Sequence, residues 1–165
     1  MFRIRYFGYL FATLAKKQKV KTKVKNVFHK GPILPSFISE SIAQQQTQTQ
    51  IGAHDIFLGQ VRADEIENRT VAAIEYTAYE SMALQKFTEI SEKPREKFEI
   101  TDVQIYHSLG RVPVGEICLF VFVCAPHRRV TFEALEFAVE AIKAEVPVFG
   151  KELFEDDSYQ WKVNT

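Results

Sequence analysis

The first candidate for chemistry is a group of basic residues where an apolar run gives way to a helical pattern. His127, Arg128 and Arg129 follow the continuous apolar stretch 117–124, which is typical of a buried strand. Apolar residues then recur at helical spacing, so the basic residues lie at the start of an expected helix over 128–145. Free backbone N–H groups and the positive end of the helix dipole attract anions there. The pattern predicts an anion site with phosphate as the natural ligand, although a solvated basic helix start would read the same way.

Further cations lie at the ends of other expected elements. Arg62 closes a strand, Lys143 lies near the end of helix 128–145, and Lys151 follows the next turn. Each has an ordinary explanation, because Arg62 and Lys151 could face solvent and Lys143 complements the helix dipole. However, Lys143 and Lys151 flank one turn and could share a pocket, where neighbouring cations lower the pKa of a Lys. Such a Lys suits proton transfer or nucleophilic chemistry on an anionic substrate. Glu152 could orient a cation or face solvent.

Several common sites are not expected. The sequence has no Gly-x-x-x-x-Gly-Lys loop, no Gly-x-Gly-x-x-Gly fingerprint and no Gly-x-Ser-x-Gly elbow. Only seven glycines occur, which disfavours a nucleotide site built from glycine loops. No Cys-x-x-Cys or His-x-x-x-His spacing indicates a metal site. We therefore expect neither a metal nor a cofactor.

The two cysteines indicate the compartment. Cys118 and Cys124 lie in one expected strand, on one face by even spacing and roughly 20 Å apart, which is too far for a disulfide. Buried reduced thiols predict a cytoplasmic protein. The apolar segment 6–15 follows two arginines as in a signal peptide, but it is too short to span a bilayer. Because a Lys-rich tract also replaces a cleavage site, we expect no membrane partner.

Length and composition predict a globular protein with an uneven charge distribution. The 165 residues suffice for one domain, and an apolar content of 46% argues against disorder. Residues 1–30 hold nine Lys or Arg and no acid, whereas residues 31–165 hold 12 basic and 21 acidic residues, a net charge of −9. A non-enzymatic nucleic-acid-binding module that uses the basic N-terminal segment is therefore one alternative function.

Apolar periodicity predicts an alternation of strands and helices that positions these residues. The expected strands are 51–61, 71–79, 100–109, 116–124, 148–154 and 159–163, and the expected helices are 35–43, 80–98 and 128–145. Pro94 is expected to end or kink the helix 80–98 near Glu92. Hairpin-length turns between strands require antiparallel pairs, which favours an α+β fold over a doubly wound sheet.

Several segments between about Lys25 and Thr165 form one ordered pattern. They are 59–62, 74–76, 79–83, 107–116, 125–128, 132–134 and 143–152, with Trp161 near the end. In this pattern the sequence resembles the large, catalytic subunit of molybdopterin synthase. So many ordered matches make a chance likeness improbable. The first residues lie outside it, so we expect a basic N-terminal extension, 1–24, and a large-subunit domain, 25–165.

The resemblance implies a fold, a reaction and partners. It implies an α/β-hammerhead-type core with an antiparallel sheet and two main helices, in a homodimer that forms a heterotetramer with a small ubiquitin-like sulfur carrier. The Gly-Gly C-terminus of the carrier ends in a thiocarboxylate, whose sulfur would pass to cyclic pyranopterin monophosphate. The product would be the dithiolene of molybdopterin, in molybdenum cofactor biosynthesis. No nucleic acid partner belongs to this interpretation.

The resemblance also implies roles for individual residues. The expected substrate-binding residues are Gln60, Val61, Arg62, His127, Arg128, Lys143, Lys151 and Glu152. Lys143 is expected to be the leading catalytic Lys. The family usually has a second Lys at the position of Gly150, and we expect Lys151 to take over its role. One step along a strand reverses the direction of a side chain, so this needs a twist or bulge at Gly150. A catalytically impaired homologue that only docks the carrier is the second alternative.

Overall fold

The computed structural model describes residues 27–156 and 158–162, so the predicted extension 1–24 and the expected strand end at Val163 lie outside the described residues. The helices within this range are α1 (Pro35–Gln45), α2 (Glu80–Lys97) and α3 (Arg128–Glu145). The strands are β1 (Phe28–Lys30), β2 (Ala53–Gln60), β3 (Glu65–Ile66), β4 (Arg69–Ala78), β5 (Asp102–Pro113), β6 (Ile117–Ala125), β7 (Val148–Phe154) and β8 (Tyr159–Trp161). The predicted α+β class, with two long helices, is confirmed.

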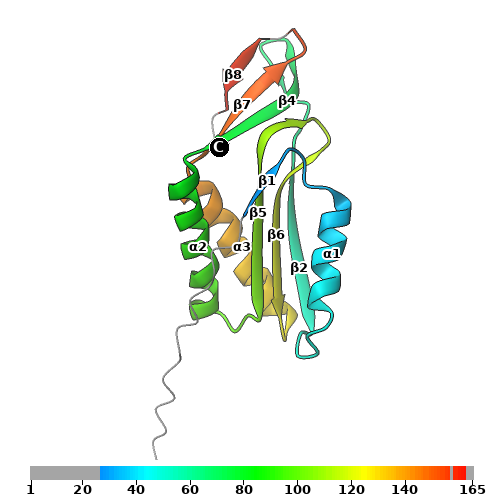
Figure 1. The fold of residues 1–165 in the computed structure, drawn as a ribbon, viewed down its shortest axis with the longest axis vertical. Coiled ribbons are helices and arrows are strands. Elements are labelled where there is room, and N and C mark those ends of the chain that lie inside the picture. The colour runs from blue at the N-terminus through cyan, green and yellow to red at the C-terminus, as the bar shows by residue number, and fades with distance from the viewer. Residues whose placement is uncertain (1–26, 157, 163–165) are drawn as a thin grey trace, which may run out of the picture.

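The strands form one sheet in the order β2-β6-β5-β4-β7-β8, in which neighbours are antiparallel. In addition, β1 lies parallel to β5, and β3 forms a hairpin with β4. β5 changes partner along its length: residues 102–107 pair with β6 and residues 110–113 pair with β4. Gly110 lies at this change with a φ of 80°, which favours glycine. β5 thereby joins a main sheet (β1, β2, β5 and β6) to an upper sheet (β4, β7 and β8), as Figure 1 shows.

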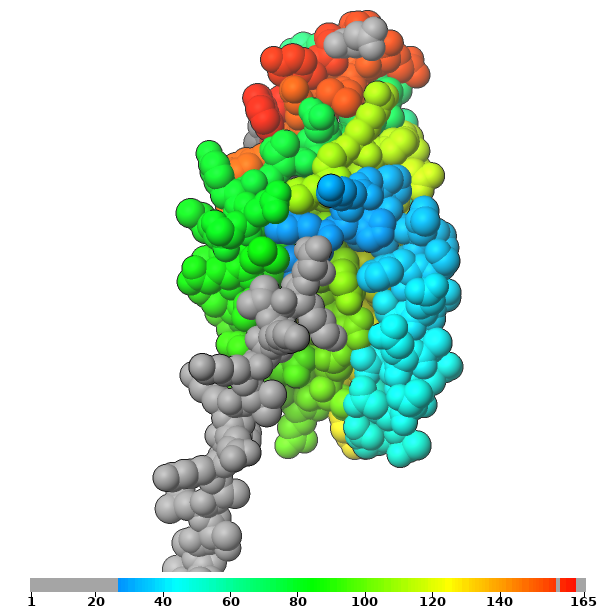
Figure 2. Space-filling view, viewed as in Figure 1, coloured from blue at the N-terminus to red at the C-terminus, as the bar shows by residue number. Residues whose placement is uncertain are grey.

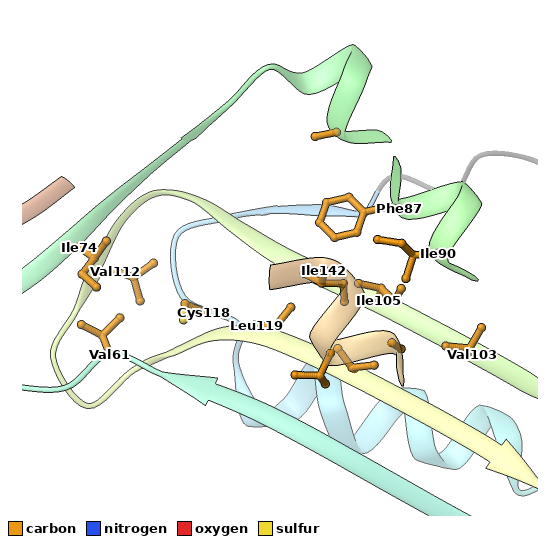
Figure 3. Packing of buried hydrophobic residues seen from close by; sticks show 14 of the residues in the cluster. Val61, Ile74, Phe87, Ile90, Val103, Ile105, Val112, Cys118, Leu119 and Ile142 are labelled. Atoms are coloured by element: carbon orange, nitrogen blue, oxygen red, sulfur yellow. The ribbon is translucent and has the colours of Figure 1, made fainter. Parts of the chain in front are cut away.

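Helices cover both faces of the main sheet. Phe87 and Ile90 of α2 and Ile142 of α3 pack on one face of the main sheet (Figure 3). Val121 of β6 belongs to the same cluster. Phe120, the neighbour of Val121 in β6, packs on the other face in a separate cluster with α1. Figure 2 shows α1 and α2 on opposite sides of the molecule, with the upper sheet at one tip. Because β6 is buried on both faces, its sequence is a continuous apolar run.

The prediction that Pro94 ends the helix near Glu92 is wrong, and a kink there stays a prediction. α2 continues to Lys97, and the Pro94 carbonyl accepts a hydrogen bond of 2.7 Å from the N–H of Phe98. A proline this close to the end of a helix removes a single N–H donor. The Pro94 ring is fully buried, so its packing offsets that loss.

The cysteines are free and buried, as predicted, but the prediction that they share a face is wrong. The register between β2 and β6 shifts at Gly59, so Cys118 is an extra residue in β6 without a partner opposite it. Such a bulge reverses the alternation of side chains beyond it. Cys118 consequently packs on the face covered by α2 and α3, whereas Cys124 packs on the α1 face.

Candidate active site

A cavity of about 470 Å³ lies where the end of α3 meets β2, β6 and the upper sheet. The polar and charged residues of its wall are Gln60, Arg62, Tyr76, His107, Cys118, Lys143 and Lys162. The apolar part of the wall includes Phe57 of β2 and Val148 of β7. Strands from both sheets and one helix end thus contribute to a single hollow.

Among the described residues that line the cavity, three are cations and none is a carboxylate. Lys143, in the last turn of α3, is exposed and has no ion pair among the described residues. Arg62 follows β2 and pairs with Asp64 at 3.0 Å, and Lys162 follows β8 and pairs with Glu152 at 2.9 Å. The cavity can therefore attract and hold an anionic ligand.

The remaining titratable groups of the wall are neutral near pH 7. Burial, followed by the neighbouring Cys118, raises the pKa of Tyr76. Burial also raises the pKa of the Cys118 thiol. His107 is buried with Nδ1 2.9 Å from the Ser108 carbonyl oxygen, and burial lowers the pKa of its ring. The charge of the cavity consequently comes from its Lys and Arg side chains.

His127 and Arg128 do not line this cavity. They lie exposed at the start of α3, where no side chain caps the first turn, so its backbone N–H groups are open to an anion. Lys143 lies at the other end of the helix, about 24 Å away at a rise of 1.5 Å per residue. A single chain does not bring the two groups of cations together.

Lys151 does not line the cavity either. The register of β7 on β4 is regular through Gly150 and Lys151, and the irregularity lies further along, next to Ala73. Without a twist or bulge at Gly150, Lys151 projects to the opposite face. Its ammonium lies 3.6 Å from Glu75 and 4.2 Å from the centroid of the Tyr159 ring.

Of the other predicted residues, Gln60 lines the cavity, whereas Val61 is buried in the core. Glu152 lies behind Lys162 and accepts a second hydrogen bond of 2.9 Å from Gln160 Nε2. The structure thus groups Gln60, Arg62 and Lys143 and leaves the other predicted residues outside the cavity; their roles stay predictions.

Sequence reasoning missed Tyr76, His107, Cys118 and Lys162. Tyr76 and His107 lie within segments that carry the family resemblance, and this resemblance was the signal that could have identified them as site residues. Cys118 was missed because the bulge that turns it toward the cavity cannot be predicted from the residue pattern. Lys162 was missed because the pairing of β8 with β7 decides which face of the hairpin its side chain occupies.

The described residues hold no group of three His, Cys, Asp or Glu side chains that could bind a metal ion. None of the helices in this part of the chain combines the length and the apolar content that crossing a lipid bilayer requires.

Comparisons with known proteins agree with one another. The sequence model of the family described as "MoaE protein" matches residues 35–145. The molybdopterin synthase catalytic subunit of Bacillus subtilis is 38% identical over 123 residues, which cover 74% of this chain and 77% of that protein. The catalytic subunit of Drosophila mojavensis is 41% identical, but the matched residues span only 31% of its length. The crystal structure of molybdopterin synthase from Staphylococcus aureus has a TM-score of 0.71 at 29% identity and covers 82% of this chain and 95% of that one. Sequence and fold agree, and the chain belongs to the MoaE protein family.

Proposed function

We propose that the chain is the catalytic subunit of a molybdopterin synthase, a sulfurtransferase of molybdenum cofactor biosynthesis. It takes sulfur from the thiocarboxylated Gly-Gly terminus of a small ubiquitin-like carrier and transfers it to cyclic pyranopterin monophosphate. The observation that carries the proposal is the cavity with three cations and no carboxylate, in a chain of the MoaE family. The two free, buried thiols fit an enzyme of the cytoplasm.

In this reaction the cavity has to bind the phosphate, protonate the oxygen that leaves and control the access of water. The thiocarboxylate sulfur forms a bond to a carbon of the pterin as the bond from that carbon to an oxygen breaks. Water then cleaves the resulting thioester, which leaves the sulfur on the pterin and the carrier as a carboxylate. Two such cycles supply both sulfurs of the dithiolene and open the cyclic phosphate. Arg62 and Lys143 neutralise the phosphate, and the Lys143 ammonium can donate a proton to the oxygen that leaves. The apolar wall around Phe57 limits the access of bulk water, so the water that cleaves the thioester enters without flooding the site.

His127 and Arg128 take part through a second copy of the chain. They lie about 24 Å from Lys143 along α3, and they are exposed at a helix start that can bind an anion. In a symmetric homodimer, the start of α3 in one protomer can complete the cavity of the other. A carrier at each of the two cavities gives the heterotetramer.

Replacement of Lys143 tests the proposed function. Lys143→Ala removes a cation that no described residue pairs with, so we expect molybdopterin formation to fall at least about 100-fold. The melting temperature should stay unchanged because the side chain is exposed. The assay combines the chain with thiocarboxylated carrier and cyclic pyranopterin monophosphate and measures molybdopterin.

The matched control is Lys97→Ala, which removes an exposed cation at the far end of α2 and should keep full activity. No product from the wild-type chain with a competent carrier would contradict the enzymatic function. If the carrier still bound in that case, the chain would be an impaired homologue that only docks it.

A further inference from the structure

Lys162 occupies space that Gly150 leaves open. The backbone N–H of Lys162 donates a hydrogen bond of 2.8 Å to the carbonyl oxygen of Gly150. A Cβ added at Gly150 would lie 3.5 Å from the Cβ of Lys162 and 3.5 Å from Cε1 of Tyr76. Gly150, Lys162 and Tyr76 all line the cavity. The Lys162 side chain therefore starts on the cavity face of the β7–β8 hairpin, beside the position where residue 150 has no side chain.

The Lys162 ammonium is held in place from behind. Glu152, whose side chain is 4% exposed, accepts a hydrogen bond of 2.9 Å from Lys162 Nζ. Gln160 Nε2 donates to the other carboxylate oxygen, also at 2.9 Å, so the carboxylate is fixed on both sides. An ammonium has three donors, and Glu152 uses one of them. The remaining donors are available to a ligand in the cavity.

The positive charge of Lys162 acts on Cys118, another residue of the cavity wall. Burial raises the pKa of the Cys118 thiol, and the positive charge of Lys162 partly counteracts that effect. Lys151, its neighbour in the same hairpin, instead pairs with Glu75 on the opposite face and does not line the cavity. Of these two lysines, only Lys162 can meet a ligand there.

We propose that Lys162, positioned by the buried Glu152, is a binding cation of the cavity that contacts an oxyanion of the reactants, in the place open beside Gly150. The inference rests on the proposed function and adds a residue to it. Two oxyanions enter this cavity, the phosphate of the pterin and the thiocarboxylate of the carrier tail. Each can accept a charge-assisted hydrogen bond from the ammonium.

The first test uses steady-state kinetics to decide whether Lys162 contacts the phosphate or the thiocarboxylate. Lys162→Met should raise KM for cyclic pyranopterin monophosphate about tenfold if the ammonium binds the phosphate, because a hydrogen bond to a charged group contributes on that order. It should raise KM for the carrier instead if the ammonium binds the thiocarboxylate. Lys162→Arg, which keeps the charge, should restore most of the affinity, and Lys97→Met is the control for loss of a distant cation. Unchanged KM values for both reactants in Lys162→Met would overturn the proposal.

A second pair of variants separates binding from a structural role. Lys162→Met leaves the buried Glu152 carboxylate without its cation, which by itself can destabilise the hairpin. The double variant Lys162→Met/Glu152→Gln removes both charges. A KM that stays raised in the double variant supports a contact with ligand, whereas a return to the wild-type value would mean that Lys162 only neutralises Glu152, and the proposal fails.

A third test moves the lysine from position 162 to position 150 and asks whether binding recovers. In Gly150→Lys/Lys162→Met, the new side chain starts on the same cavity face, and its Cβ meets only side-chain atoms, the nearest at 3.1 Å. Partial recovery of the KM value would support the proposal. Calorimetry measures the binding of cyclic pyranopterin monophosphate without turnover, so it tests the role of Lys162 independently of the proposed function. If the wild-type chain is inactive, the function fails, yet binding weakened by Lys162→Met would still support this residue.

Discussion

The thiol of Cys118 forms part of the cavity wall and donates a hydrogen bond of 3.3 Å to the carbonyl oxygen of Gly59. Burial raises its pKa, so the thiol stays protonated near neutral pH. The thiolate, rather than the thiol, is the nucleophilic form of cysteine. Cys118 therefore lines the proposed site of sulfur transfer in its protonated, weakly nucleophilic form.

Cys124 leads to a prediction about alkaline stability. Burial, followed by the neighbouring Asp102, raises the pKa of its thiol from 9.0 to about 12. Between these values the unfolded chain releases the Cys124 proton while the folded chain keeps it, so the folded state binds more protons. The free energy of unfolding should therefore fall as the pH rises above about 9, and the fall should be smaller in Cys124→Ala. Urea denaturation at about pH 7.5, 9 and 10.5 measures both slopes, and equal slopes for the two proteins would contradict this account.

At the residue scale, sequence predicted some cavity cations and missed others for a physical reason. Arg62 and Lys143 follow from the ends of a strand and a helix, which local periodicity reveals. Lys151 and Lys162 lie in one hairpin, and which of them faces the cavity depends on its pairing with β4. Strand register is set by contacts between distant segments, and a step of one residue exchanges the two faces.

Among the elements, α3 was the most predictable. Its observed bounds, Arg128–Glu145, equal those expected from the sequence, because an amphipathic pattern over 18 residues is strong local information. β5 was less predictable, since it extends to Pro113 where a strand end at Leu109 was expected. Its added length pairs with β4, a partner that the local sequence of β5 does not identify.

The start of α3 is positioned by close contact with the residue before β2, Gly52. The N–H of Gly52 donates a hydrogen bond of 3.1 Å to the Ala125 carbonyl oxygen, and an added Cβ would lie 2.3 Å from the carbonyl oxygen of Pro126. Because both partners are backbone, Gly52→Ala should force them apart and lower the free energy of unfolding by roughly 1–3 kcal/mol. Activity should fall as well, since His127 follows Pro126 directly.

Urea denaturation of Gly52→Ala measures this cost. Gly150→Ala is the matched control, because its added methyl group meets only side chains, the nearest at 3.1 Å. We expect a smaller loss there. Equal losses in the two variants would show that the contact between Gly52 and Pro126 does not constrain the start of α3.

Across the whole molecule, the cations that sequence analysis singled out, apart from Lys151, form two groups at opposite ends of α3. Arg62 and Lys143 line the cavity, whereas His127 and Arg128 lie exposed about 24 Å from Lys143. The sequence could indicate both groups as anion sites but could not show that one chain keeps them apart. This separation follows from α3 being a single uninterrupted helix.

A complementation experiment tests whether two copies of the chain share the site. Arg128→Ala and Lys143→Ala should each be nearly inactive as homodimers. In a heterodimer of the two variants, one cavity combines the intact Lys143 of one protomer with the intact Arg128 of the other, and the second cavity carries both defects. Differently tagged chains, co-expressed and purified through both tags, should therefore regain about half of the wild-type activity per dimer. If each cavity used residues of one chain only, both cavities of the heterodimer would keep a defect, and the doubly tagged protein would stay inactive.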